Sequence, residues 1–117
     1  MEKIICYNCN GLGEKTRSRG PHSSIHRTTK CYTCMGSGEL ELTLESLKNS
    51  IIHHLNNLNR PSVKTDIHAL WGEVKSWCKN KHYEMGGSYA SWGKEISVII
   101  NIYSKQFRFT ISFSELN

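Results

Sequence analysis

The sequence contains no long apolar run. No window approaches the roughly 18 consecutive apolar residues that a membrane-spanning helix needs, so no membrane segment is expected. The first residues, MEKIICYNCNG, also lack the extended apolar stretch of a secretory signal. We therefore expect a cytoplasmic protein whose thiols are kept reduced, with no membrane among its partners.

Acidic side chains are few as well. The chain has 10 Asp and Glu among its 117 residues, none in a suggestive pair, and no nucleophile, base and acid form a recognisable set. The glycine-containing stretch YEMGGSYASWGK lacks the spacing of a phosphate-binding loop, G-x-x-x-x-G-K-[ST]. We therefore expect that the protein is not an enzyme.

The cysteines, in contrast, follow a repeated pattern. CYNCNGLG begins at Cys6 and CYTCMGSG at Cys31, and both follow C-Y-x-C-x-G-x-G. An odd total of five cysteines, two C-x-x-C pairs and no export signal favour metal binding over disulfides. The fifth cysteine, Cys78, lies on the apolar stripe of an expected helix, where a lone cysteine is usually part of the core.

Two C-x-x-C pairs supply four soft ligands at the tetrahedral corners that Zn²⁺ prefers. We predict one structural Zn²⁺, with no open position for catalysis, held by Cys6, Cys9, Cys31 and Cys34. Each repeat, residues 6–13 and 31–38, is expected to form a zinc knuckle, a tight turn that aims backbone N–H groups at sulfur. Glycine allows such turns, and the predicted knuckle glycines are Gly11, Gly13, Gly36 and Gly38. A redox pair and an iron–sulfur site are the alternatives.

Positive charge is concentrated in the first third of the chain. The formal charge is +5, and residues 1–40 hold six Lys and Arg against three Asp and Glu. The segment EKTRSRGPHSSIHRTTK between the two cysteine pairs predicts a hairpin that turns at Gly20-Pro21. Its basic side chains are candidates for contact with an acidic protein surface or with phosphates, the alternative being a solvated polar hairpin. These candidates are Lys15, Arg17, Arg19, His22, His26, Arg27 and Lys30.

Residues 41–117 have a different, regular pattern. Apolar residues at helical spacing predict a helix after an N-cap at Thr43, and a second helix capped by Ser62. Residues 80–94 are expected to form a glycine-rich loop, and residues 39–44 either a third strand or the start of the first helix. Alternation in EISVIINIY and QFRFTISF predicts a hairpin with a turn at Ser104-Lys105, which pairs 102 with 107 and 96 with 113.

The fold class predicted is therefore α+β. An N-terminal zinc-bound β-hairpin domain, residues 1–40, precedes an α-α-β-β module, residues 41–117. The apolar face of the C-terminal hairpin is expected to pack under the two helices.

The repeat C-x-x-C-x-G-x-G resembles the zinc-binding region of DnaJ-type co-chaperones. Its two-copy form is most similar to the small bacterial inhibitor of the tryptophan RNA-binding attenuation protein. The resemblance covers residues 6–38 and implies an extended zinc-bound β-hairpin that acts in protein–protein contact. DnaJ-type proteins carry four repeats and a His-Pro-Asp tripeptide, both lacking here, and the inhibitor has no counterpart of residues 41–117. The chaperone function and the partner therefore do not carry over.

We expect a non-enzymatic, zinc-stabilised binding protein that docks on a partner protein to regulate or inhibit it, as a bacterial or phage accessory protein would. The alternative is a nucleic-acid-binding regulator that uses the same basic hairpin. A homo-oligomer is a third possibility, because the helical faces can associate. Tyr7 and Tyr32 occupy equivalent repeat positions and are expected to pack beside the metal, with stacking on a ligand as the alternative.

Overall fold

The computed structural model of the protein describes residues 2–18 and 26–116. The chain forms two compact units, Met1–Ser46 and Leu47–Asn117. The expected order of a cysteine-containing segment, two helices and a C-terminal antiparallel hairpin is confirmed, and the fold mixes α and β. Within the described ranges, no helix has the length and apolar character that crossing a bilayer requires. The division into domains at residue 40 stays a prediction.

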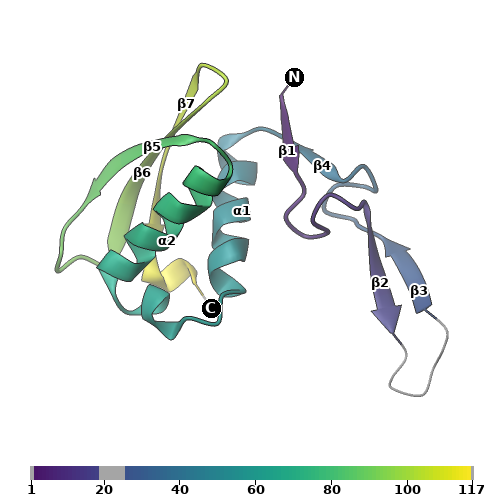
Figure 1. The fold of residues 1–117 in the computed structure, drawn as a ribbon, viewed down its shortest axis with the longest axis horizontal. Coiled ribbons are helices and arrows are strands. Elements are labelled where there is room, and N and C mark those ends of the chain that lie inside the picture. The colour runs from purple at the N-terminus through teal and green to yellow at the C-terminus, as the bar shows by residue number, and fades with distance from the viewer. Residues whose placement is uncertain (1, 19–25, 117) are drawn as a thin grey trace. The chain divides into compact units, whose positions relative to one another are not determined.

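The first unit is built from two short antiparallel strand pairs. Strand β1 (Lys3–Ile5) pairs with β4 (Glu39–Glu41), and β2 (Glu14–Ser18) pairs with β3 (His26–Lys30). The two cysteine repeats lie between these strand pairs (Figure 1). Strand β1 was not predicted, because three residues are too few for an alternating pattern.

The second unit carries a conventional apolar core. Helix α1 (Leu44–Asn56) continues into this unit from the first, a short 3₁₀ turn follows at Pro61–Lys64, and helix α2 (Ile67–Asn80) packs on a three-stranded antiparallel sheet (Figure 1). The sheet has the order β5 (Glu84–Tyr89), β6 (Glu95–Ile102) and β7 (Lys105–Ser112). The largest fully buried side chains of the unit are aliphatic and include Leu47, Ile51, Leu55, Leu70, Ile96, Ile100 and Ile111. Burial of this apolar surface is the main force that stabilises the unit.

The alternating C-terminal hairpin is present, but its predicted register is wrong by two residues. Ile102 pairs with Lys105 and Ile100 with Phe107, so the turn lies at Tyr103-Ser104. Both turn residues have positive φ, 51° and 67°, as the tight turn that matches the twist of a hairpin requires. Because a shift of two residues preserves the alternation, the apolar side chains still share one face.

The expected loop over residues 80–94 is also wrong in part, because Glu84–Tyr89 forms β5 and pairs with β6. Two adjacent glycines, Gly86 and Gly87, interrupt the apolar alternation from which a strand is recognised. Gly87 has φ +125°, and a Cβ at this position would lie 2.0 Å from the carbonyl oxygen of Ser97. The glycine is therefore required by the close approach of two strands.

The helix starts differ from the prediction in one case. Asp66, rather than Ser62, caps α2, and its carboxylate accepts a 2.9 Å hydrogen bond from the His68 N–H. Thr43 caps α1 as predicted, since its Oγ1 accepts from the Ser46 N–H at 3.0 Å. Ser46 Oγ accepts in turn from the Thr43 N–H at 2.9 Å, so a serine completes the reciprocal cap. Residues 39–44 contain both a strand and a helix start, since Glu39–Glu41 forms β4 and Leu44 begins α1. Strand β4 pairs with β1, and the third strand of the C-terminal sheet is β5.

Replacement of the two glycines of β5 by alanine should have different effects. Gly87→Ala should lower the free energy of unfolding of the second unit by about 1–3 kcal/mol, because the new Cβ meets the β6 backbone at a positive φ. Gly86→Ala is the matched control, since a Cβ there would meet no atom within 4 Å. Denaturant unfolding followed by tryptophan fluorescence measures the difference, because Trp71, Trp77 and Trp92 all belong to this unit. Equal losses from both variants would contradict the close approach.

Candidate metal centre

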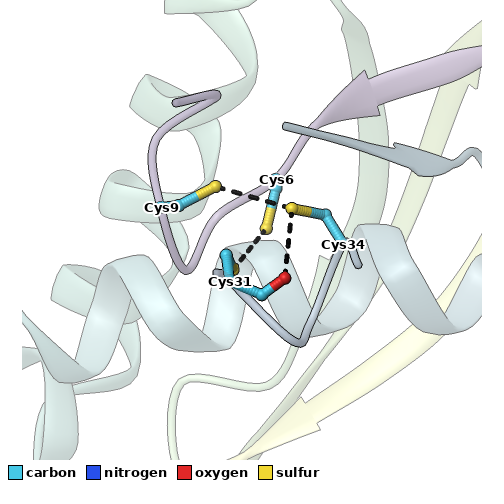
Figure 2. Close-up of side chains that lie close together, drawn as sticks. All are labelled: Cys6, Cys9, Cys31 and Cys34. Carbon is cyan, nitrogen blue, oxygen red and sulfur yellow. Dashed lines mark hydrogen bonds between the residues drawn. The ribbon is translucent and has the colours of Figure 1, made fainter. Parts of the chain in front are cut away.

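Four cysteine sulfurs converge at the junction of the two strand pairs (Figure 2). The Sγ atoms of Cys6 and Cys31 are 3.9 Å apart, those of Cys9 and Cys34 are 3.7 Å apart, and all four lie within 4.8 Å of one another. All four side chains are buried. Among the described residues, this is the one group of three or more potential ligands that is close enough to hold a metal ion. The structure thus brings together the predicted ligand residues.

These spacings fit one tetrahedral ion. A Zn–S bond of about 2.3 Å places two sulfurs of a tetrahedron about 3.8 Å apart, close to the two shortest Sγ–Sγ distances. A disulfide needs sulfurs about 2.05 Å apart. A cluster of several irons binds its cysteines through different iron atoms, which spreads the sulfurs beyond one tetrahedral edge. The four sulfurs can therefore hold a single metal ion such as zinc.

The two repeats adopt nearly the same backbone conformation. The φ angles of Gly11 and Gly36 are 85° and 83°, and those of Gly13 and Gly38 are 78° and 79°. Each of these glycines lies in the left-handed region that side chains disfavour, which explains the glycine positions of the motif. The two repeats therefore form two nearly identical turns, and both turns present their cysteine sulfurs to the four-cysteine cluster.

Backbone N–H groups point at the sulfurs. Gly13 N donates to Cys9 Sγ and Gly38 N donates to Cys34 Sγ, both at 3.2 Å. Such donors spread the negative charge of metal-bound thiolates and fix the direction of each ligand. The prediction that the turns of the repeat aim N–H groups at sulfur is therefore confirmed, and the donors are the second glycine of each repeat, Gly13 and Gly38.

Gly13 and Gly38 also join one repeat to the other. The carbonyl oxygen of Gly38 accepts from Cys6 N at 2.9 Å, and that of Gly13 accepts from Cys31 N at 3.0 Å. A Cβ on Gly13 would lie 2.5 Å from the carbonyl oxygen of Gly36, and one on Gly38 would lie 2.3 Å from that of Gly11. Neither position has room for a larger residue.

The thiols of the cluster differ in acidity. The N–H of Cys34, which outweighs burial, lowers the pKa of the Cys31 thiol to about 6. Burial raises the pKa of the Cys6 thiol to about 12. Four thiolates this close repel one another, so a divalent cation is the partner that allows all four to ionise together.

The two tyrosines of the repeat do not behave alike. Tyr7 is half-buried, and burial together with the neighbouring sulfurs of Cys6 and Cys31 raises its pKa. Tyr32 is 76% exposed, so the expectation that both rings pack beside the metal is wrong for Tyr32. The repeat therefore fixes the backbone of the knuckles and leaves the tyrosines free to differ.

The predicted basic contact residues are only partly covered by the structure. Arg19 and His22 lie outside the described residues. Lys15 and Arg17 lie on β2, His26, Arg27 and Lys30 lie on β3, and Arg17 is the register partner of Arg27. Lys30 is exposed, and its aliphatic stem crosses Gly36, with Cε 3.1 Å from where a Cβ would be.

Thiol reactivity should distinguish the cluster from the fifth cysteine. Cys78 is 1% exposed, and burial raises the pKa of its thiol to about 12. With a chelator present and the second unit folded, four thiols should react with an aromatic disulfide at pH 8, and the fifth only after denaturation. The Cys78→Ala variant should show the same four reactive thiols and no fifth. Five thiols reacting at one rate would contradict this arrangement.

Comparison with known proteins does not assign the chain to a family. No protein-family model, no curated protein and no solved structure matches it. The likeness to DnaJ-type repeats therefore remains a likeness of motif, and the four converging sulfurs carry the functional argument.

Proposed function

We propose that the protein binds one Zn²⁺ through Cys6, Cys9, Cys31 and Cys34, and that this ion is structural. Four buried thiols at tetrahedral spacing support the assignment, and thiolate is a ligand type that zinc favours. Four protein ligands fill the coordination of zinc, so water has no position at which the metal would activate it. Bound zinc would offset half of the thiolate charge and give the two knuckles a fixed centre.

The first unit should depend on this ion for its fold. Structural zinc binding contributes about 10–16 kcal/mol of apparent free energy in small zinc domains at neutral pH. Cys31→Ser should therefore reduce the zinc content from one ion per chain to none and unfold the first unit. Native mass spectrometry measures the metal, and amide hydrogen exchange measures protection at residues 2–18 and 26–46.

The fifth cysteine provides the matched control for this experiment. Cys78→Ser should keep one zinc per chain and the protection of the first unit. If Cys31→Ser kept both its zinc and its protected amides, the four-cysteine site would be contradicted.

We further propose that the protein is a non-enzymatic binding protein, in which zinc fixes the β2–β3 strand pair as an arm that docks on a partner protein and regulates it. The observation that carries this proposal is the attachment of both strands directly to the cysteine knuckles. The excess of basic residues in this part of the chain favours an acidic partner surface.

Charge reversal on the arm tests this function. The partner is first isolated from the native cell on the immobilised zinc-loaded protein, identified by mass spectrometry and then purified. The triple variant Arg17→Glu, Arg19→Glu, Arg27→Glu should weaken binding of that partner at least tenfold and keep one zinc per chain. A matched triple variant of second-unit cations, Lys64→Glu, Lys79→Glu, Lys94→Glu, should bind normally. Unchanged binding by the arm variant would contradict a docking role for the arm.

The basic excess of residues 1–40, with Arg17 and Arg27 at paired backbone positions of β2 and β3, also favours a second candidate, a nucleic-acid-binding regulator, because basic residues bind a phosphate backbone. Salt dependence separates the two candidates. A nucleic-acid binder loses affinity steeply with salt, with a logarithmic slope of about −0.9 for each phosphate neutralised on duplex DNA. Absence of any RNA or DNA shift at low salt would exclude this candidate.

A further inference from the structure

The two knuckles allow a comparison within one chain. Each position in the first repeat has an equivalent 25 residues later, and the glycine φ angles of the two repeats agree within 2°. Positions that differ between the repeats are therefore not fixed by the metal-binding geometry. Three such pairs surround the contacts between the repeats, namely Ile5 and Lys30, Asn10 and Met35, and Leu12 and Ser37.

Met35 is strained without being buried. Its φ is 55°, against 54° for the equivalent Asn10. Asparagine tolerates this left-handed conformation, whereas a long unbranched side chain such as methionine is disfavoured there. Met35 is 65% exposed, so packing in the core does not offset the strain. Core packing therefore does not account for a methionine at this position.

Leu12 is a second exposed apolar side chain of the knuckles, with 76% of its surface exposed. Its equivalent, Ser37, uses its hydroxyl within the knuckle and donates to the Cys34 carbonyl oxygen at 2.8 Å. Leu12 and Met35 directly precede Gly13 and Gly36, whose backbones are in contact. Leu12 and Met35 are therefore the residues that precede the two glycines of one backbone contact between the repeats.

Lys30 adds a cation beside these two residues, because its stem crosses Gly36. In the first repeat Ile5 takes the equivalent position, with its Cγ2 3.1 Å from where a Cβ on Gly11 would be. The flank at the Gly13–Gly36 contact therefore carries two exposed apolar side chains and a positive charge. We name Leu12, Lys30 and Met35 the knuckle patch. The other flank combines Ile5 with the polar residues Asn10 and Ser37.

We infer that the knuckle patch is a docking surface for a protein segment that combines an apolar side chain with a carboxylate. Methionine adapts its shape to apolar partners, and exposed apolar residues beside a charge are typical of interaction sites. Lys30 and the basic excess of residues 1–40 complement a carboxylate. This inference rests on the proposed binding function and specifies the surface and the partner chemistry.

A displayed library of random peptides, panned on the zinc-loaded full chain, tests the inference. The selected peptides should pair Leu, Ile, Phe or Trp with Asp or Glu. The double variant Leu12→Ser, Met35→Asn gives each position the residue that its equivalent already carries, so the knuckles should fold and keep one zinc. It should bind the selected peptides at least tenfold more weakly, and Lys30→Ile should remove the preference for acidic residues.

Ile5→Ser, on the other flank, is the matched control and should bind the selected peptides like the parent chain. Selected peptides that bind parent and double variant equally would overturn the knuckle patch and leave the binding function standing. If no peptide is selected while a random RNA pool is retained, both the inference and the protein-docking function fail.

Discussion

Mutual repulsion among four buried thiolates is the constraint on which the proposed metal site depends. The Sγ atoms lie within 4.8 Å of one another and the side chains are buried, so the cluster cannot carry four negative charges without a cation. A tetrahedral divalent ion removes this repulsion and turns it into attraction toward one centre. The glycine turns, the N–H groups aimed at sulfur and the contacts between repeats all orient the ligands toward that centre.

The two units are stabilised in different ways. In the second unit, aliphatic side chains from both helices and the sheet supply the stability of an ordinary core. In the described part of the first unit, the buried cluster consists of the four cysteines, with Leu40 packed against it. A segment with so little apolar burial generally needs a disulfide or a metal ion to fold. The proposed zinc would thus stabilise the first unit, whereas the second unit is stabilised by its own apolar core.

Sequence alone predicted the features that depend on short-range spacing. The clustered cysteines, the left-handed glycines and the alternating faces of β6 and β7 follow from local sequence patterns. Features that depend on approach between distant segments were missed or misplaced. The sequence around Gly87 predicted a loop, and only the close approach of β6 shows why a glycine is needed in this strand. The hairpin register depends on which residues adopt positive φ in the turn. The contacts of Gly13 and Gly38 across the repeats could not be inferred from either repeat alone.

X-ray absorption at the zinc K-edge tests whether the four cysteines hold a single zinc ion. Such a site gives one shell of four sulfur atoms at about 2.3 Å, with no nitrogen or oxygen ligand and no second metal nearby. The same spectrum should be obtained from the Cys78→Ala variant, whose removed thiol lies outside the cluster. A mixed shell of sulfur with nitrogen or oxygen, or a metal–metal scattering path, would contradict a single structural zinc held by these four cysteines.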